Sequence, residues 1–152
     1  MVVKKNFVAG LLLLFVSSLA WPQEITYRKH IRPLWEDKCE RCHGSNAPYL
    51  GTFEENKKAY EDDDKGPRMD SYADLIFFIG WPDTGAIMRR LDDGKSKKDG
   101  VSGNMYKRLG KNEEERQANL KIFKQWVGED AWTMKKPNEI TKEELMRIKT
   151  PY

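Results

Sequence analysis

The pentapeptide Cys39-Glu40-Arg41-Cys42-His43 combines two thiols, three positions apart, with an imidazole directly after the second thiol. Covalent haem attachment needs this spacing, because each sulfur adds across one porphyrin vinyl group and the adjacent histidine then binds the iron. Residues three and four positions apart share a helix face, so all three side chains can address one macrocycle. A dithiol redox pair, a disulfide and part of a zinc site are the alternatives. We favour haem attachment because the chain has only two cysteines and the histidine stands in the required place.

The first 20 residues have the pattern of a secretory signal peptide. Lys4 and Lys5 precede an apolar run over residues 7–16, and Ser18-Leu19-Ala20 supplies the small residues of a cleavage site. The apolar run is short for a permanent membrane-spanning helix. We therefore expect cleavage after Ala20 and a periplasmic or otherwise extracytoplasmic location. If the segment stays uncleaved, it tethers the protein to the membrane.

The composition suits one small domain. We expect this domain over residues 21–132, followed by a C-terminal helical extension over residues 133–152. Loss of the leader's two lysines would leave 25 basic and 24 acidic residues, a net charge of +1. This charge gives no reason to expect nucleic-acid binding. A buried porphyrin would add apolar volume to a core that the side chains alone fill thinly.

A helix is predicted over residues 25–38, directly before the haem motif. Its apolar stripe consists of Tyr27, Ile31, Leu34 and Trp35. Pro33 interrupts the stripe, so the helix is either kinked there or begins its main part there. His30 is the only other histidine and a possible second iron ligand. We favour an ordinary surface role for it, because this helix leads into the proximal side of the haem.

The remaining chain is predicted to be helical, with polar loops and no strand. Capping patterns place helix starts at Thr52, Ser71, Asn112 and Thr141, each with an acidic residue three positions later. A further short helix is expected over residues 85–91. Between it and the Asn112 helix, residues 92–104 form a polar, glycine-rich loop that leads to Met105. The predicted fold class is therefore all-α, with short helices wrapped around one haem.

These features together resemble a monohaem class I cytochrome c, more narrowly the cytochrome-c-like domains of bacterial secreted proteins. The matching blocks are Ile31-Arg32-Pro33-Leu34-Trp35, the haem motif, residues 84–91, Met105, residues 112–115 and residues 120–126. The resemblance implies one covalently attached haem c, thioether bonds to Cys39 and Cys42, and His43 as proximal iron ligand. Such families usually carry Met-Pro at the distal ligand, whereas this chain has Met105-Tyr106. The segment after Thr133 lies outside the shared pattern.

The sixth iron ligand has several candidates besides His30. The methionines after the haem motif are Met69, Met88, Met105, Met134 and Met146. Met69 follows His43 closely, which leaves little chain to cross the ring, and Met88 lies in a short helix where packing is the commoner role. Met105 stands in irregular chain, where the backbone can approach the iron freely. Its position before the last long helix also resembles the ligand's place in class I cytochromes, so we predict Met105, with Met88 as the alternative.

The resemblance implies an electron carrier rather than an enzyme, because iron held on both faces has no open position for a substrate. Two alternatives remain open. A five-coordinate haem sensor or gas-binding protein would lack the Met105 bond, and a haem subunit of a larger respiratory complex would use the segment after Thr133 for attachment. Peroxidase chemistry is disfavoured because only one other histidine is available.

The expected partners are redox proteins that dock transiently, since outer-sphere transfer needs only a brief encounter. Basic residues flank Met105 on both sides. They are Lys95, Lys97, Lys98, Lys107, Arg108 and Lys111. If this loop borders the haem edge, the cluster would steer acidic partners, whereas simple solvation of the loop is the alternative.

Overall fold

The computed structural model describes residues 23–152, so the expected signal peptide lies outside the described residues. Within that range the chain is all-helical and has no strand, which confirms the predicted fold class. The α-helices are α1 (Arg32–Lys38), α2 (Glu40–His43), α3 (Leu50–Glu55), α4 (Lys57–Asp62), α5 (Tyr72–Ile79), α6 (Ala86–Leu91), α7 (Glu113–Val127) and α8 (Lys142–Leu145). Short π or 3₁₀ turns are η1 (Tyr27–Ile31), η2 (Tyr106–Leu109), η3 (Glu129–Ala131) and η4 (Pro137–Glu139). None of the described helices is long and apolar enough to cross a membrane.

The segment before the haem motif is a helix in two parts. The π turn η1 begins after Thr26, whose side chain accepts a hydrogen bond from the backbone N–H of Lys29. The regular helix α1 follows it, with Pro33 in its first turn, where a missing N–H costs nothing. Pro33 therefore starts the regular part, which was one of the two outcomes that the sequence allowed.

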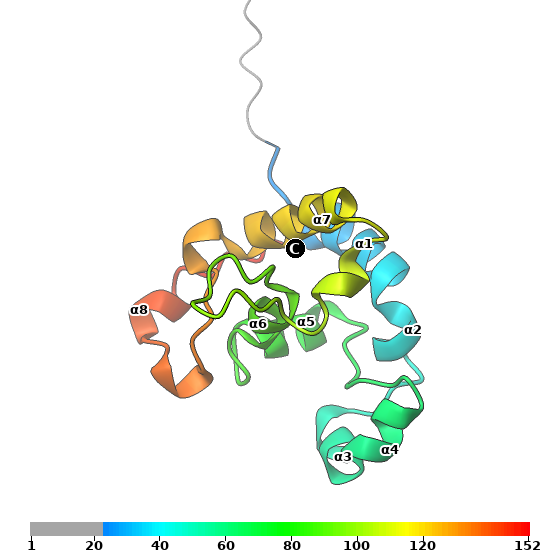
Figure 1. Cartoon of the computed structure of the whole chain (residues 1–152). Helices are drawn as coiled ribbons and strands as arrows, with labels where there is room; N and C mark the ends of the chain where they lie inside the picture. Colours follow the sequence, from blue (N-terminus) through cyan, green and yellow to red (C-terminus); the bar gives the residue numbers. More distant parts are fainter. Residues whose placement is uncertain (1–22) are drawn as a thin grey trace, which may run out of the picture.

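The core lies between α7 and the helices beneath it. Figure 1 shows α7 and α1 side by side across one side of the molecule, with α5 and α6 on the other side. The fully buried side chains include Ile31, Leu75, Ile79, Met88, Leu109, Leu120, Phe123, Trp126 and Val127. Four of these come from α7, so this helix supplies the largest part of the core.

Three of the four predicted helix starts hold, at Ser71, Asn112 and Thr141, and one is wrong. Ser71 forms a full capping box with Asp74 at the start of α5, and Thr141 forms one at α8. Thr52 does not begin a helix, because α3 already starts at Leu50 and Thr52 lies within it. Phe53 is buried, Leu50 is partly buried, and both line a cavity described below, so the packing of these apolar residues places the start of α3 ahead of the cap preference.

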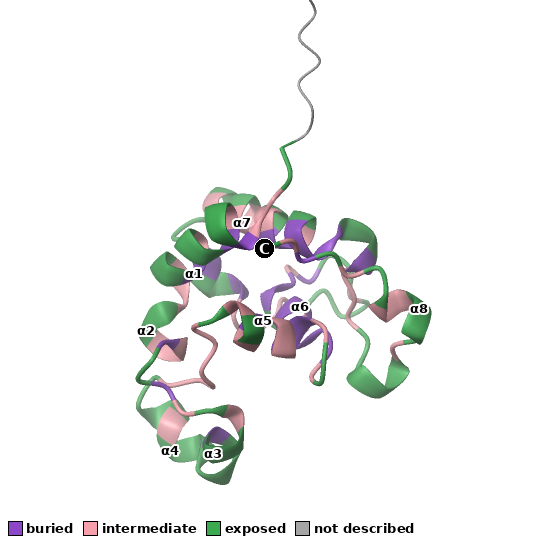
Figure 2. Cartoon of the chain, turned by 180° about the vertical axis from the view of Figure 1, so that it is seen from behind, coloured by how far each residue is buried: buried purple, intermediate pink, exposed green. Residues whose placement is uncertain are grey.

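The helices α3 and α4 form a separate lobe. Figure 1 shows this pair standing apart from the body of the molecule, and Figure 2 shows that most of its surface is exposed. Its small apolar centre is the stacked pair Phe53 and Tyr60, with ring centroids 6.1 Å apart. The lobe follows the haem motif directly, so it borders the space next to Cys42 and His43.

The last residues of the chain pack on the first described ones. The backbone N–H groups of Tyr27 and Arg28 donate to the carbonyl oxygens of Pro151 and Tyr152, at 2.8 and 3.1 Å. The rings of Tyr27 and Tyr152 stack, with centroids 5.5 Å apart. The indole N–H of Trp126 also donates to Pro151, over 2.9 Å. The expected C-terminal extension is therefore part of the packed body, and only α8 and the short turn η4 are helical within it.

Candidate haem-binding site

A cavity of about 310 Å³ opens between α2, the α3–α4 lobe, α5, α6 and the loop that carries Met105. Cys39, Cys42, His43 and Met105 all line it. Much of the remaining wall is apolar and comes from Trp35, Leu75, Phe78, Ile87, Leu91 and Phe123. The structure thus brings all four sequence-predicted site residues to one apolar cavity.

The two cysteines are free, partly buried thiols. The backbone N–H of Cys39 donates to Trp35 over 2.7 Å, and that of His43 donates to Cys39 over 3.0 Å, so the motif continues the helical turn. Burial raises the pKa of Cys39 to about 12, with smaller contributions from Cys42 and Asp37. A redox-active dithiol needs a cysteine with a lowered pKa, so this environment argues against that alternative.

The imidazole of His43 is held by one backbone carbonyl. Its Nδ1 lies 2.7 Å from the oxygen of Pro67, which accepts the Nδ1–H hydrogen bond and leaves Nε2 with its lone pair. Burial lowers the pKa of His43, the Pro67 carbonyl opposes this shift, and the nearby Arg90 guanidinium adds to it. The neutral imidazole that results is the form that binds a metal ion.

Gly66 makes the close approach to His43 possible. A Cβ atom at this position would lie 2.2 Å from Cε1 and 2.6 Å from Nδ1 of His43. Two backbone hydrogen bonds of 2.9 Å fix the segment, from Gly66 N–H to Cys42 and from Met69 N–H to His43. Gly66 and Pro67 were not predicted to be site residues. Their only signal was the Gly-Pro pair itself, which indicates a turn but not what the turn contacts.

Met105 reaches the cavity from the loop after α6. Its backbone N–H donates to the carbonyl of Arg90 over 3.0 Å, and its own carbonyl accepts from Arg108 N–H over 2.9 Å. The preceding loop passes very close to α6, because a Cβ on Gly103 would lie 2.2 Å from the Arg90 carbonyl oxygen. Met105 is partly buried and packs at the edge of the core.

The alternative ligands are placed differently. Met88 is fully buried outside the cavity lining, and its sulfur accepts a 3.4 Å hydrogen bond from Thr133 N–H. Nδ1 of His30 accepts from Thr26 N–H over 3.1 Å, and His30 does not line the cavity. Met69 does line it, but its backbone is bonded to His43 itself. Met134 and Met146 are not among the lining residues.

These residues fit a covalently bound haem. The wall combines two thiols, a neutral imidazole with a free Nε2 and a thioether, set in apolar surroundings. Cations are also present, since the exposed side chains of Arg90 and Arg108 line the cavity and would suit the haem carboxylates. A zinc site is not supported, because residues 23–152 contain no group of three or more His, Cys, Asp or Glu that could hold a metal ion.

Comparison with known proteins agrees with this chemistry. The family model described as PccH cytochrome c matches residues 26–152, and this match includes the segment after Thr133 that we expected to lie outside the shared pattern. Among solved structures, the monohaem cytochrome PccH from Geobacter sulfurreducens is 50% identical, with a TM-score of 0.79, and the alignment covers 86% of this chain and 100% of that one. A search of curated proteins finds no match. The chain therefore belongs to the PccH cytochrome c family and is an electron-carrying haem protein with one covalently bound haem c.

Proposed function

We propose that the protein carries single electrons between extracytoplasmic redox partners, with His43 and Met105 as the two axial iron ligands. The observation that carries this proposal is that both residues line one apolar cavity, although they come from chain segments far apart in the sequence. When bound, the haem supplies an iron atom that gains and loses one electron. The protein's part is to hold the ligands, exclude water and present an edge to its partners.

Each site residue has a distinct part in this function. The sulfur atoms of Cys39 and Cys42 form the thioether bonds. The Pro67 carbonyl fixes the orientation of the His43 ring and raises the basicity of its Nε2. The thioether of Met105 is a weak donor that favours the reduced metal, so a His43/Met105 pair gives a higher reduction potential than two imidazoles.

The apolar wall of the cavity also affects the reduction potential. Leu75, Phe78, Ile87 and Leu91 surround the site with groups that cannot solvate an additional charge. Ferric haem carries one positive charge more than ferrous haem, so this environment favours the reduced form and raises the reduction potential. The same side chains keep water away from the Met105 ligand.

For docking, we propose an acidic patch on the partner that meets the rim of the cavity. Arg90 and Arg108 are exposed there and form no ion pair with another described residue. The basic cluster expected from the sequence contributes less directly. Lys95 and Lys97 pair with Asp93 and Asp99 over 3.2 and 3.7 Å, and only Arg108 of that cluster lines the cavity.

The respiratory-subunit alternative keeps only part of its proposed attachment segment free. It assigned the segment after Thr133 to binding a larger complex, yet the carbonyl groups of Thr150, Pro151 and Tyr152 all accept hydrogen bonds within this chain. Residues 150–152 are therefore occupied by the protein's own N-terminal part and by α5 and α7, whereas η4 and α8 remain largely exposed.

The test is to purify the protein with its haem and record oxidised and reduced spectra. We expect a porphyrin that acid-acetone cannot extract, and a sulfur-to-iron charge-transfer band in the ferric form that disappears in Met105→Ala. Cys42→Ala should impair haem attachment. A ferric spectrum without that band, together with tight binding of carbon monoxide or cyanide, would instead identify a five-coordinate sensor.

A further inference from the structure

The residue after the distal ligand is a buried tyrosine bonded to α7. We propose that Tyr106 is a positioning residue, whose hydroxyl group, held by Glu113 and Gln117, keeps Met105 in place for binding iron. This inference rests on the proposed His43/Met105 ligation. It concerns how firmly the ligand is held, which the ligand's identity alone does not determine.

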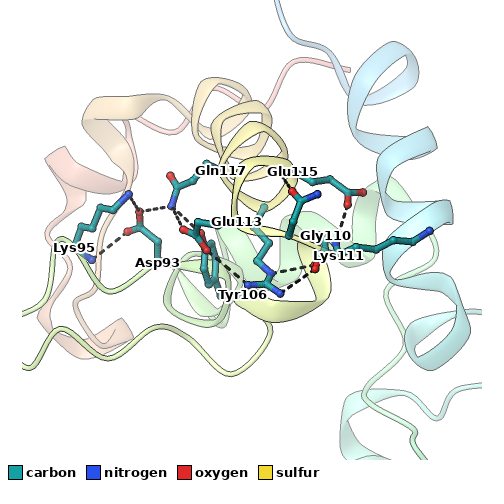
Figure 3. Close-up of polar contacts among 10 residues, drawn as sticks. Asp93, Lys95, Tyr106, Gly110, Lys111, Glu113, Glu115 and Gln117 are labelled. Carbon is teal, nitrogen blue, oxygen red and sulfur yellow. Dashed lines mark hydrogen bonds and ion pairs between the residues drawn. The ribbon is translucent and has the colours of Figure 1, made fainter.

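The hydroxyl of Tyr106 is held by two short hydrogen bonds. It donates to Glu113 Oε1 over 2.6 Å and accepts from Gln117 Nε2 over 2.6 Å. Gln117 Nε2 also lies 3.0 Å from the same Glu113 oxygen, so the three groups form a closed triangle (Figure 3). Tyr106 is only 5% exposed, although the Glu113 side chain is 61% exposed, so these bonds are partly shielded from water and their loss leaves the ligand loop less firmly held.

Gln117 also holds the other end of the ligand loop. Its Nε2 lies 3.0 Å from Oδ2 of Asp93, which is the second residue after the end of α6 (Figure 3). The side chain of Asp93 is 5% exposed, so this contact is also shielded from water. The loop thus leaves α6 at Asp93 and reaches Met105 and Tyr106, and one α7 side chain bonds both of its ends.

The far side of η2 has its own anchors. Asn119 Nδ2 donates to the Leu109 carbonyl over 2.6 Å, and Arg116 Nε donates to Gly110 over 3.0 Å. Leu109 is 1% exposed within the core. Removing the Tyr106 hydroxyl should therefore leave this part of η2 attached to α7 and release mainly the side that carries Met105.

The arrangement also explains why this position can do without proline. Proline after the ligand restricts the backbone through its fixed φ angle, whereas tyrosine has no such restriction. Here the side-chain bonds of Tyr106 and the backbone bonds of Met105 provide the restriction. Met105 N–H donates to Arg90 over 3.0 Å and Arg108 N–H donates to Met105 over 2.9 Å.

Imidazole binding to the ferric, haem-loaded protein measures how often Met105 leaves the iron. Imidazole can bind only in the open state, so its apparent affinity rises in proportion to the open fraction. We expect Tyr106→Phe and Gln117→Met each to bind imidazole about five- to thirtyfold more tightly than the wild type, the factor that corresponds to one or two kcal/mol.

Tyr72→Phe is the matched control. It removes another shielded tyrosine hydroxyl bond, 2.8 Å long, to the carbonyl of Thr150, away from the ligand loop. Unfolding midpoints of all three variants separate global loss of stability from local release of Met105. We expect Tyr72→Phe to lower the midpoint and leave imidazole affinity at the wild-type value.

Two results would overturn the inference. One is wild-type imidazole affinity in both Tyr106→Phe and Gln117→Met, and the other is an equal increase in Tyr72→Phe. If Tyr106→Phe does not fold, Gln117→Met decides. Failure of the underlying ligation looks different, because the wild-type ferric spectrum would then lack the sulfur-to-iron band and Met105→Ala would not change it.

Discussion

The carbonyl oxygen of Arg90, in the last turn of α6, accepts a 3.0 Å hydrogen bond from the backbone N–H of Met105. This bond places the proposed distal ligand directly beside the helix that forms part of the cavity wall. A second bond, 2.7 Å from Gly103 N–H to the Asp92 carbonyl, runs beside it. The loop therefore returns to the end of the helix it left, and its position depends on how closely the two backbones approach.

Gly103→Ala should disrupt this approach. The added Cβ would lie 2.2 Å from the Arg90 carbonyl oxygen and 2.4 Å from its carbon, so one backbone must move. We expect a loss of about 1–3 kcal/mol in the free energy of unfolding and a weakened sulfur-to-iron band. Gly51→Ala in α3 is the control, because a Cβ there meets nothing within 4 Å. An unchanged band in Gly103→Ala would show that Met105 does not depend on this contact.

Gly66→Ala should disturb the side of the site that holds His43. Its Cβ would lie 2.2 Å from Cε1 of His43, so the imidazole must rotate or the Pro67 carbonyl must withdraw. We expect a smaller yield of haem-loaded protein and a higher reduction potential, because a misoriented imidazole is a weaker donor and stabilises ferric iron less. Absorbance per mole of purified chain and a redox titration measure these effects. Normal values for both would contradict the close packing of Gly66 on His43.

Met105→Ala should change the ferric spectrum and the reduction potential, whereas Met88→Ala should change the free energy of unfolding. Met105→Ala is expected to abolish the sulfur-to-iron band and lower the reduction potential. Met88 is fully buried, so Met88→Ala should keep the band and lower the free energy of unfolding by about 2–5 kcal/mol. Ferric spectra and urea denaturation of both variants provide the comparison. The opposite spectral pattern would make Met88 the ligand and leave the fold unchanged.

Asp70→Asn should lower stability at neutral pH only. Two hydrogen bonds of 2.6 and 2.8 Å from the Arg68 guanidinium hold the pKa of Asp70 below its usual range. A carboxyl with a lowered pKa stabilises the fold above its unfolded pKa of about 3.9, and this contribution disappears as the pH falls through the folded pKa. The variant's urea midpoint should therefore be lower than the wild type's at pH 7, and the difference should vanish in acid.

The matched control for Asp70→Asn is Asp62→Asn, which breaks the highly exposed Lys58–Asp62 pair. Such pairs contribute little, so the urea midpoint should hardly change at either pH. A pH-independent loss in Asp70→Asn would assign its role to packing rather than to charge.

The haem motif was predictable because its chemistry depends on spacing along the chain, and Cys39, Cys42 and His43 do line one cavity. Met105 was predicted from its irregular surroundings, and the structure also places it at the cavity, although its iron bond stays a prediction. The supports of the two ligands were not predictable. Pro67 and Arg90 act through backbone carbonyl groups, which every residue has, so their identity carries no signal.

The helices likewise show some features that the local sequence predicts and others that depend on contacts distant along the chain. Capping by Ser71 and Thr141 is local, and both predictions hold. At α7, Asn112 does cap the helix, but the Glu115 carboxylate accepts from Lys111 N–H and pairs with Lys38 in place of completing the box. The packing of residues 150–152 on Tyr27 was also missed, because contacts across the whole chain leave no periodic pattern in the sequence.

The pairing of residues 27–28 with residues 151–152 has a consequence for the order of events during folding. Tyr27 and Arg28 find their backbone partners only when Pro151 and Tyr152 have been made. The helical segment that leads from Tyr27 into Cys39 and Cys42 is therefore fully anchored only after the last residues have packed on it. The two thiols would thus stay accessible for bond formation with the porphyrin until residues 151–152 pack on this segment.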